Sequence, residues 1–174
     1  MKNLKLIHTL IVFFIFNISI LNAENIAFID MNAIINNSAV GIKISKSLEA
    51  SHKKNILEFK KIEESLKKKE IEIISKKNIL DKDKYEKEIK LLREKVKIYR
   101  KQREDSLNNL SKKRINATKE LIRLIDPIIQ KYSSDNSVSL ILNKKDIILG
   151  LKNLDITNNI MSEVNKKITK IDIK

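Results

Sequence analysis

The sequence predicts an α+β protein in which a small β-body carries a long antiparallel helical hairpin. Two observations predict this fold. First, 85 consecutive residues between Gly41 and Pro127 contain neither glycine nor proline. Because glycine and proline are the residues that interrupt helices, we expect this stretch to be helical throughout. Second, short apolar segments typical of strands lie on both sides of it, toward the two ends of the 174-residue chain.

Residues 1–23 have the layout of a secretory signal peptide. Lys2 and Lys5 precede an apolar run at 10–16, and the segment ends with the small residue Ala23. We expect export and cleavage near Ala23. The alternative is that residues 10–21 are kept as a membrane anchor, although the apolar run is short for a span of about 20 residues. Either way the remaining chain lies outside the cytoplasmic membrane.

Residues 24–40 are expected to form the first part of the body. The run from Ile26 to Ile29 is short and continuously apolar, which is typical of a strand buried on both faces. Residues 38–41 then lead into the long helical segment.

Residues 41–127, called the arm below, show a heptad pattern. Apolar residues recur at alternating steps of four and three, from Leu48 to Ile73 and again from Tyr85 to Ala117. Polar side chains interrupt this seam at His52, Asn55, Lys69, Arg103, Ser106 and Lys113. Residues 78–84 are rich in Asn and Asp, which favour turns, so we place the tip of a hairpin there.

Each leg of this hairpin would have about 38 residues and span roughly 57 Å. The diluted seam predicts weak pairing toward the tip, and therefore bending or splaying. One continuous helix is the alternative to a hairpin, because residues 78–84 contain no glycine.

Residues 128–174 are expected to complete the body. The second leg should close before Pro127, with a brief helical continuation over Ile128, Ile129 and Tyr132 as the alternative and a loop at 133–137. Residues 138–142 and 147–151 read as two strands of a hairpin, and helical spacing begins near Asp155, where Asp155 or Thr157 is placed to cap a helix. Three strands and one helix bury too little surface to be secure alone, which predicts oligomerisation.

The positive charge is concentrated on the arm. The chain has 36 Lys and Arg against 22 Asp and Glu, and residues 41–130 hold 26 basic and 15 acidic side chains, a net charge of +11. Such a field would attract an acidic partner: nucleic acid, an anionic membrane surface or an acidic client protein. The alternative is that it only solvates the helix faces, in a chain rich in Lys, Asn and Ile.

The residues needed for most catalytic sites are missing. The chain has no cysteine, and His52 is the only histidine after residue 23, at a seam position where packing is its expected role. Two glycines cannot build a phosphate-binding loop. We therefore predict that the protein is not an enzyme and has no catalytic, cofactor-binding or metal-binding residues.

The order of these segments resembles the Skp (OmpH-like) periplasmic chaperone family. Ile26-Ala27-Phe28-Ile29-Asp30-Met31 looks like the family's opening strand. The segments Val138–Leu142 and Ile147–Leu151, followed by Asp155-Ile156-Thr157, look like its closing hairpin and the start of its last helix. The charged helical hairpin lies between them, as it does in that family.

The resemblance implies a homotrimer whose strands join into a central β-body, with three arms around a cavity. It implies a soluble periplasmic holdase that needs no ATP or other cofactor and binds unfolded outer-membrane proteins. An anionic lipid or lipopolysaccharide surface is a further candidate partner. The arm shares composition rather than residues with the family, so no individual binding residue is transferred to this sequence.

Two other functions compete with this reading. A membrane-anchored coiled-coil stalk would follow if residues 10–21 stayed in the membrane. A basic nucleic-acid-binding coiled coil would account for the arm's charge, but the export segment and the lack of interleaved aromatic residues for base stacking argue against it.

Overall fold

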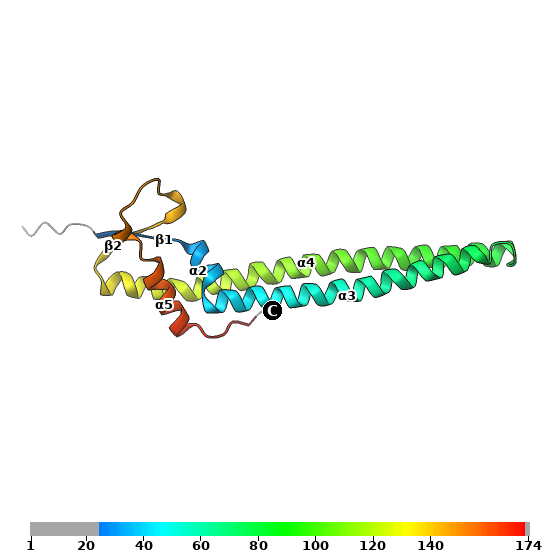
Figure 1. The fold of residues 1–174 in the computed structure, drawn as a ribbon, viewed down its shortest axis with the longest axis horizontal. Helices are drawn as coiled ribbons and strands as arrows, with labels where there is room; N and C mark the ends of the chain where they lie inside the picture. Colours follow the sequence, from blue (N-terminus) through cyan, green and yellow to red (C-terminus); the bar gives the residue numbers. More distant parts are fainter. Residues whose placement is uncertain (1–24, 173–174) are drawn as a thin grey trace, which may run out of the picture.

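The computed structural model describes residues 25–172 and shows a small body from which a two-helix arm projects (Figure 1). The main elements in chain order are β1 (Asn25–Ile29), α2 (Met31–Asn37), α3 (Ala39–Ser75), α4 (Lys82–Asp135), β2 (Val138–Asn143) and α5 (Thr157–Lys167). Two short 3-10 helices, η1 (Lys144–Asp146) and η2 (Lys152–Leu154), lie between β2 and α5. The α+β fold class is confirmed. The predicted signal peptide lies outside the described residues.

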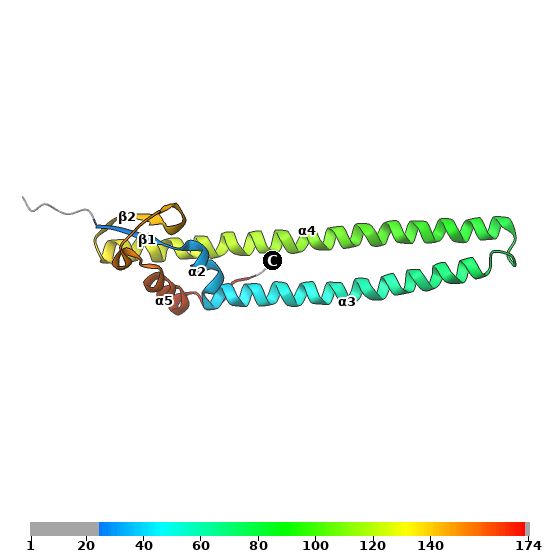
Figure 2. The same cartoon turned by 45° about the horizontal axis from the view of Figure 1, so that its top comes forward.

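The arm is an antiparallel pair of helices, as the heptad pattern predicted. Helices α3 and α4 run side by side along its whole length, and the chain reverses between Ser75 and Lys82 (Figures 1 and 2). With 37 residues, α3 spans about 55 Å. Helix α3 begins at Ala39, two residues earlier than expected, because the Ser38 hydroxyl caps it by accepting the Gly41 N–H at 3.2 Å.

Pro127 does not end the second leg, contrary to the sequence prediction. Helix α4 continues through Pro127 to Asp135, so residues 133–135 of the expected loop are helical. Proline inside a helix removes one backbone hydrogen bond and costs stability. Ile125 and Ile128, on either side of Pro127, are both buried in the body. Burial of these side chains against the body offsets that cost.

The sheet has two parallel strands, so the predicted hairpin of 138–142 with 147–151 is wrong. Strand β2 pairs with β1, with Ala27 opposite Ile141 and Phe28 opposite Leu142. Parallel pairing needs a long crossover, and the whole arm provides it. Residues 147–151 form no strand, because β2 hydrogen-bonds to β1 and the 147–151 segment has no strand partner within the described chain.

The core lies where the arm enters the body. Ile34 of α2, Leu121 and Ile125 of α4, and Ile160 and Val164 of α5 are completely or almost completely buried there. Asn165 of α5 accepts the Ala39 N–H at 2.7 Å, which ties the last helix to the start of α3. The body therefore clamps the base of both arm helices.

Candidate binding surfaces of the arm and the body

The seam of the arm is only partly filled by apolar side chains. Phe59 and Tyr99 meet edge to face with ring centroids 6.0 Å apart, and Ile73 near the tip is 2% exposed. Asn55 and Ser106 occupy facing seam positions and hydrogen-bond at 2.6 Å. The burial of Ile73 shows that the legs pack against each other near the tip, while bending of the arm stays a prediction.

Two cavities lie between the two legs. One, of about 400 Å³, lies at mid-arm and is lined by His52, Asn55, Ile56, Phe59, Lys60, Glu63, Tyr99, Arg103, Ser106 and Leu107. A second, also of about 400 Å³, includes Ile62, Leu66 and Ile98 and shares Tyr99 with the first. The His52 side chain is exposed at the first cavity, so its predicted packing in the seam is wrong. The seam residue Arg103 of α4 is exposed as well, which leaves the seam open here.

The outer surface of the arm mixes lysines with exposed apolar side chains. These apolar residues come from both legs and the tip: Ile42, Ile56, Leu57, Ile71, Ile74, Ile79, Leu91, Ile98, Leu107 and Ile115. Ion pairs within one helix, such as Glu49 with Lys53 at 2.6 Å, neutralise only part of the positive charge. The arm therefore offers many separate apolar contacts within a positive field.

The sheet has one covered and one open face. Ala27, Ile29 and Ile141 point into the core. Because side chains alternate along a strand, Ile26, Phe28, Leu140 and Leu142 share the opposite face, where Phe28 is 7% exposed and the other three are exposed. Strand β1 is flanked by β2 on one side and by Asp155 on the other, which leaves β2 as the edge strand among the described residues.

Residues 147–151 extend this apolar face. Ile148 and Leu149 are 104% and 92% exposed, and Leu151 is also exposed. Within the same segment Gly150 lies against the Phe28 ring, where a Cβ atom would come within 2.7 Å of Cε1. The segment is thus held on the body while its largest side chains project into solvent. An apolar patch of this kind marks an interaction surface.

A hydrogen-bonded chain fixes the segment between β2 and α5. Lys144 Nζ lies 2.6 Å from Asp155 Oδ2, and Asp155 accepts the N–H and the hydroxyl of Thr157. Thr157 Oγ1 accepts the Asp30 N–H at 2.9 Å, and Asp30 caps α2 by accepting the Ala33 N–H at 2.8 Å. Ile156 is the N-cap residue of α5 and no side chain caps this helix, so the predicted capping by Asp155 or Thr157 is wrong, although Asp155 accepts the Thr157 N–H just before the first turn.

This arrangement also shifts the ionisation of its charged groups. Partial burial raises the pKa of the Asp155 carboxyl, but hydrogen bonds from Lys144 and Thr157 outweigh it and hold that pKa below its ordinary value. The hydrogen bond to Asp155 likewise raises the pKa of Lys144. Both groups are therefore charged at neutral pH.

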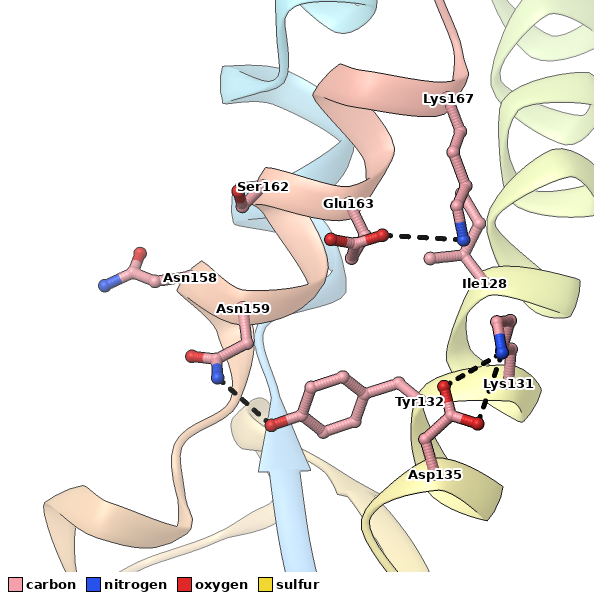
Figure 3. Close-up of a pocket in the computed structure, with 9 residues that line it drawn as sticks. All are labelled: Ile128, Lys131, Tyr132, Asp135, Asn158, Asn159, Ser162, Glu163 and Lys167. Atoms are coloured by element: carbon pink, nitrogen blue, oxygen red, sulfur yellow. Dashed lines mark hydrogen bonds and ion pairs between the residues drawn. The ribbon is translucent and has the colours of Figure 1, made fainter.

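A groove of about 550 Å³ lies between the end of α4 and α5 (Figure 3). Its polar groups bond to one another: Lys131 with Asp135, Lys167 with Glu163, and the Asn159 amide with the Tyr132 hydroxyl at 3.1 Å. The Asn158 side chain points away from the groove (Figure 3). We read the groove as the polar junction of two packed helices.

Two negative findings apply to residues 25–172. No group of three or more His, Asp or Glu side chains gathers there in a way that could hold a metal ion. None of the helices in this part of the chain is long and apolar enough to cross a membrane.

Comparison with known proteins identifies the family. The family model for outer membrane proteins of the OmpH-like type matches residues 25–164, which include the sheet, the whole arm and most of α5. This chain belongs to the OmpH-like family. Comparison with curated proteins gave no significant match.

A solved structure of an OmpH-like protein has the same fold. It is the crystal structure of a proposed outer membrane chaperone (OmpH-like) from Caulobacter crescentus CB15, with a TM-score of 0.82 and 15% sequence identity. The match covers 86% of this chain and 88% of the other. At this identity the likeness establishes the fold that the two OmpH-like proteins share.

The sequence identified the arm of this OmpH-like protein but not its individual contact residues. The mid-arm cavity follows from Asn55, Arg103 and Ser106 at seam positions, where large apolar residues would normally close the gap between helices. That polar pattern was the available signal for a cavity. The open face of the sheet gave no such signal, since its position depends on the β1–β2 register.

Proposed function

We propose that this OmpH-like protein is an ATP-independent holdase chaperone of the periplasm that binds unfolded outer-membrane proteins and prevents their aggregation. The observation that carries the proposal is the arm surface, where exposed apolar side chains from both legs are set among lysines. The export layout of residues 1–23 and membership of the OmpH-like family support it.

The arm surface suits an unfolded chain better than a folded partner. Its apolar residues are dispersed along both legs rather than gathered into one patch, so each contact is weak and many are made together. An unfolded barrel protein exposes apolar strands that aggregate in water. The net positive charge of the arm attracts acidic clients and speeds encounter, an effect that salt screens.

The body is the oligomerisation surface in this proposal. Residues 24–40 and 128–174 form it, and its exposed sheet face and the segment 147–151 present apolar side chains that a second copy would cover. The free edge of β2 offers backbone groups for pairing, and residues 147–151 then supply the strand that the single chain lacks. Three copies would hold three arms around a shared cavity.

No residue has a catalytic or cofactor role in this proposal. Release of the client needs no energy source, because the client leaves when it reaches a better-bonded folded state. An anionic lipid or lipopolysaccharide surface stays a candidate partner of the basic arm.

The test is suppression of aggregation. A urea-unfolded outer-membrane barrel protein is diluted into buffer with and without the mature protein, and light scattering is followed. We expect scattering to be suppressed at an equal ratio of client to trimer, without ATP. Undiminished scattering at that ratio contradicts the proposal.

A further inference from the structure

The mid-arm cavity has features that the dispersed arm surface lacks. It forms where Asn55 and Ser106 face each other across the seam and where the seam residue Arg103 is exposed. The Phe59 and Tyr99 rings line it, and the Tyr99 hydroxyl donates to Glu63 Oε2 at 3.2 Å. Its volume of about 400 Å³ is within the range of ligand-binding clefts.

Two aliphatic side chains from opposite legs border the cavity. Ile56 of α3 is 51% exposed and Leu107 of α4 is 52% exposed, and both belong to the lining. Neither occupies a seam position, so helix pairing does not require them to be apolar. An apolar ligand group that entered the cavity would cover both side chains and contact the two aromatic rings, which would remove apolar surface from water.

The charge around the cavity is mainly positive. Lys60 and Arg103 line it, and within the described residues neither makes an ion pair. Glu63, the one carboxylate in the lining, already accepts the hydrogen bond from Tyr99. An acidic group beside an inserted side chain would therefore find two unpaired cations within the same site.

We propose that this cavity is a client subsite that takes one large apolar or aromatic side chain of an extended chain whose neighbouring residues are acidic. In an extended chain, successive side chains point to opposite sides, so the acidic neighbours stay outside the cavity, in the positive field of the exposed Lys60 and Arg103 side chains, while the apolar residue enters. Strands of membrane barrels alternate apolar and polar residues in this way. The inference rests on the proposed chaperone function and names the chemistry of one contact within it.

The arm offers a closely matched control. Leu57 and Ile115 also come one from each leg, are 61% and 49% exposed, and do not line the cavity. The variants Ile56→Ser/Leu107→Ser and Leu57→Ser/Ile115→Ser therefore remove equivalent apolar surface with equal effects on helix propensity. Only the first pair changes the proposed subsite.

The probe is a fluorescent peptide of about ten residues, the length of a barrel strand, with alternating Phe or Leu and Asp or Glu. Binding is followed by fluorescence anisotropy. We expect about tenfold weaker binding to Ile56→Ser/Leu107→Ser, because two anchoring contacts are lost, and a change below about twofold for the control pair. A peptide with Lys in place of the acidic residues should bind the wild type more weakly than the acidic peptide does.

Equal losses of peptide affinity in the two double variants, or no loss of affinity in either, would overturn the proposed subsite. Equal affinity for the acidic and the lysine peptides would overturn it as well. If the oligomeric mass changed in Ile56→Ser/Leu107→Ser but not in the control variant, the cavity would be a contact between copies of the chain, which contradicts the proposal. If that pair does not fold, Ser106→Leu fills the cavity from within and should weaken peptide binding in the same way.

The same proteins separate this inference from the proposed function. If the wild type suppresses aggregation of the barrel protein while both double variants bind the peptide equally well, only the subsite fails. If the wild type does not suppress aggregation, the chaperone function fails, whatever the peptide binding shows.

Discussion

Asn55 and Ser106 hydrogen-bond across the arm at 2.6 Å although they are 51 positions apart in the sequence. They occupy facing positions of a seam that is otherwise mainly apolar. A polar pair at such positions fixes which residues of two helices face each other, and it lowers the stability of the pairing. It also leaves open the cavity lined by the Phe59 and Tyr99 rings.

The first prediction concerns this pair. Replacing both residues, Asn55→Leu/Ser106→Leu, should raise the free energy of unfolding by about 1 kcal/mol, because apolar side chains fill the seam and no hydrogen-bonding group is left without its partner. Urea unfolding followed by circular dichroism measures the change. Asn55→Leu alone should raise the free energy of unfolding by less, since Ser106 then loses its hydrogen-bond partner. A double variant less stable than the wild type would be evidence against this view of the seam.

Gly41 gives a prediction whose sign is unusual for a helix. A Cβ atom at this position would lie 1.9 Å from the Ile35 carbonyl oxygen, a backbone atom that cannot move aside freely. Gly→Ala inside a helix normally stabilises it by about 1 kcal/mol. Here Gly41→Ala should instead lower the free energy of unfolding by about 2 kcal/mol or more.

Thermal and urea unfolding of Gly41→Ala check this expectation. Ser45→Ala, one turn further along α3 at an exposed position, is the control and should be neutral or slightly stabilising. If Gly41→Ala were as stable as that control, the close approach of α2 to α3 would not exist in solution.

Thr157 connects three parts of the body. Its buried hydroxyl accepts the Asp30 N–H and donates to Asp155. Thr157→Val keeps the shape but leaves the Asp30 N–H without its partner and removes one of the hydrogen bonds to Asp155, so the free energy of unfolding should fall by about 1–3 kcal/mol. Thr157→Ser keeps the hydroxyl and should lie closer to the wild type than to Thr157→Val in the same urea titration. If Thr157→Val were more stable than Thr157→Ser, the hydrogen-bond network around Thr157 would not be a source of stability.

The Asp155–Lys144 pair predicts a pH dependence. Because the pKa of Asp155 is lowered in the folded protein, its stabilising effect is present above the ordinary value of 3.8 and is lost as the pH falls through the lowered pKa. Because the pKa of Lys144 is raised, its effect is present below 10.5 and is lost as the pH rises through the raised pKa. The stability difference between wild type and Asp155→Asn should therefore be largest near neutral pH.

Urea unfolding at a series of pH values from acid to neutral measures this difference. Other carboxylates with lowered pKa values, including Glu72 and Glu120, also titrate in acid, so the informative quantity is the difference between variants. Asp146→Asn, which removes one exposed carboxylate beside the pair, is the control for the loss of a surface charge. If the difference in free energy of unfolding between wild type and Asp155→Asn stayed constant across this pH range, the Asp155–Lys144 pair would not be a source of pH-dependent stability.

The sequence predicted the arm well because the information for it is local. The heptad spacing from Leu48 to Ile73 and from Tyr85 to Ala117 is a property of each helix alone, and the Asp and Asn residues near the tip mark where the chain reverses. The passage of α4 through Pro127 as one helix to Asp135 was missed, because it depends on the burial of Ile125 and Ile128 in the body. Tertiary packing outweighed a strong local signal there.

The body was predicted less well because its sheet is built from contacts far apart in the sequence. Val138–Leu142 and Ile147–Leu151 look like two strands of one hairpin, yet β2 pairs with β1 across the whole length of the arm. The apolar pattern of residues 147–151 was read as the second strand of that hairpin, but in the described chain this segment forms no strand and exposes Ile148, Leu149 and Leu151. Which partner it meets is not encoded in local spacing.

The central claim is that the apolar face of the body joins copies of the chain so that their arms surround a common space. Multi-angle light scattering of the chain from Glu24 onward tests it most directly. We expect the mass of three chains, with a hydrodynamic radius larger than that of a compact globule of that mass. A particle with the mass of one chain would contradict the account.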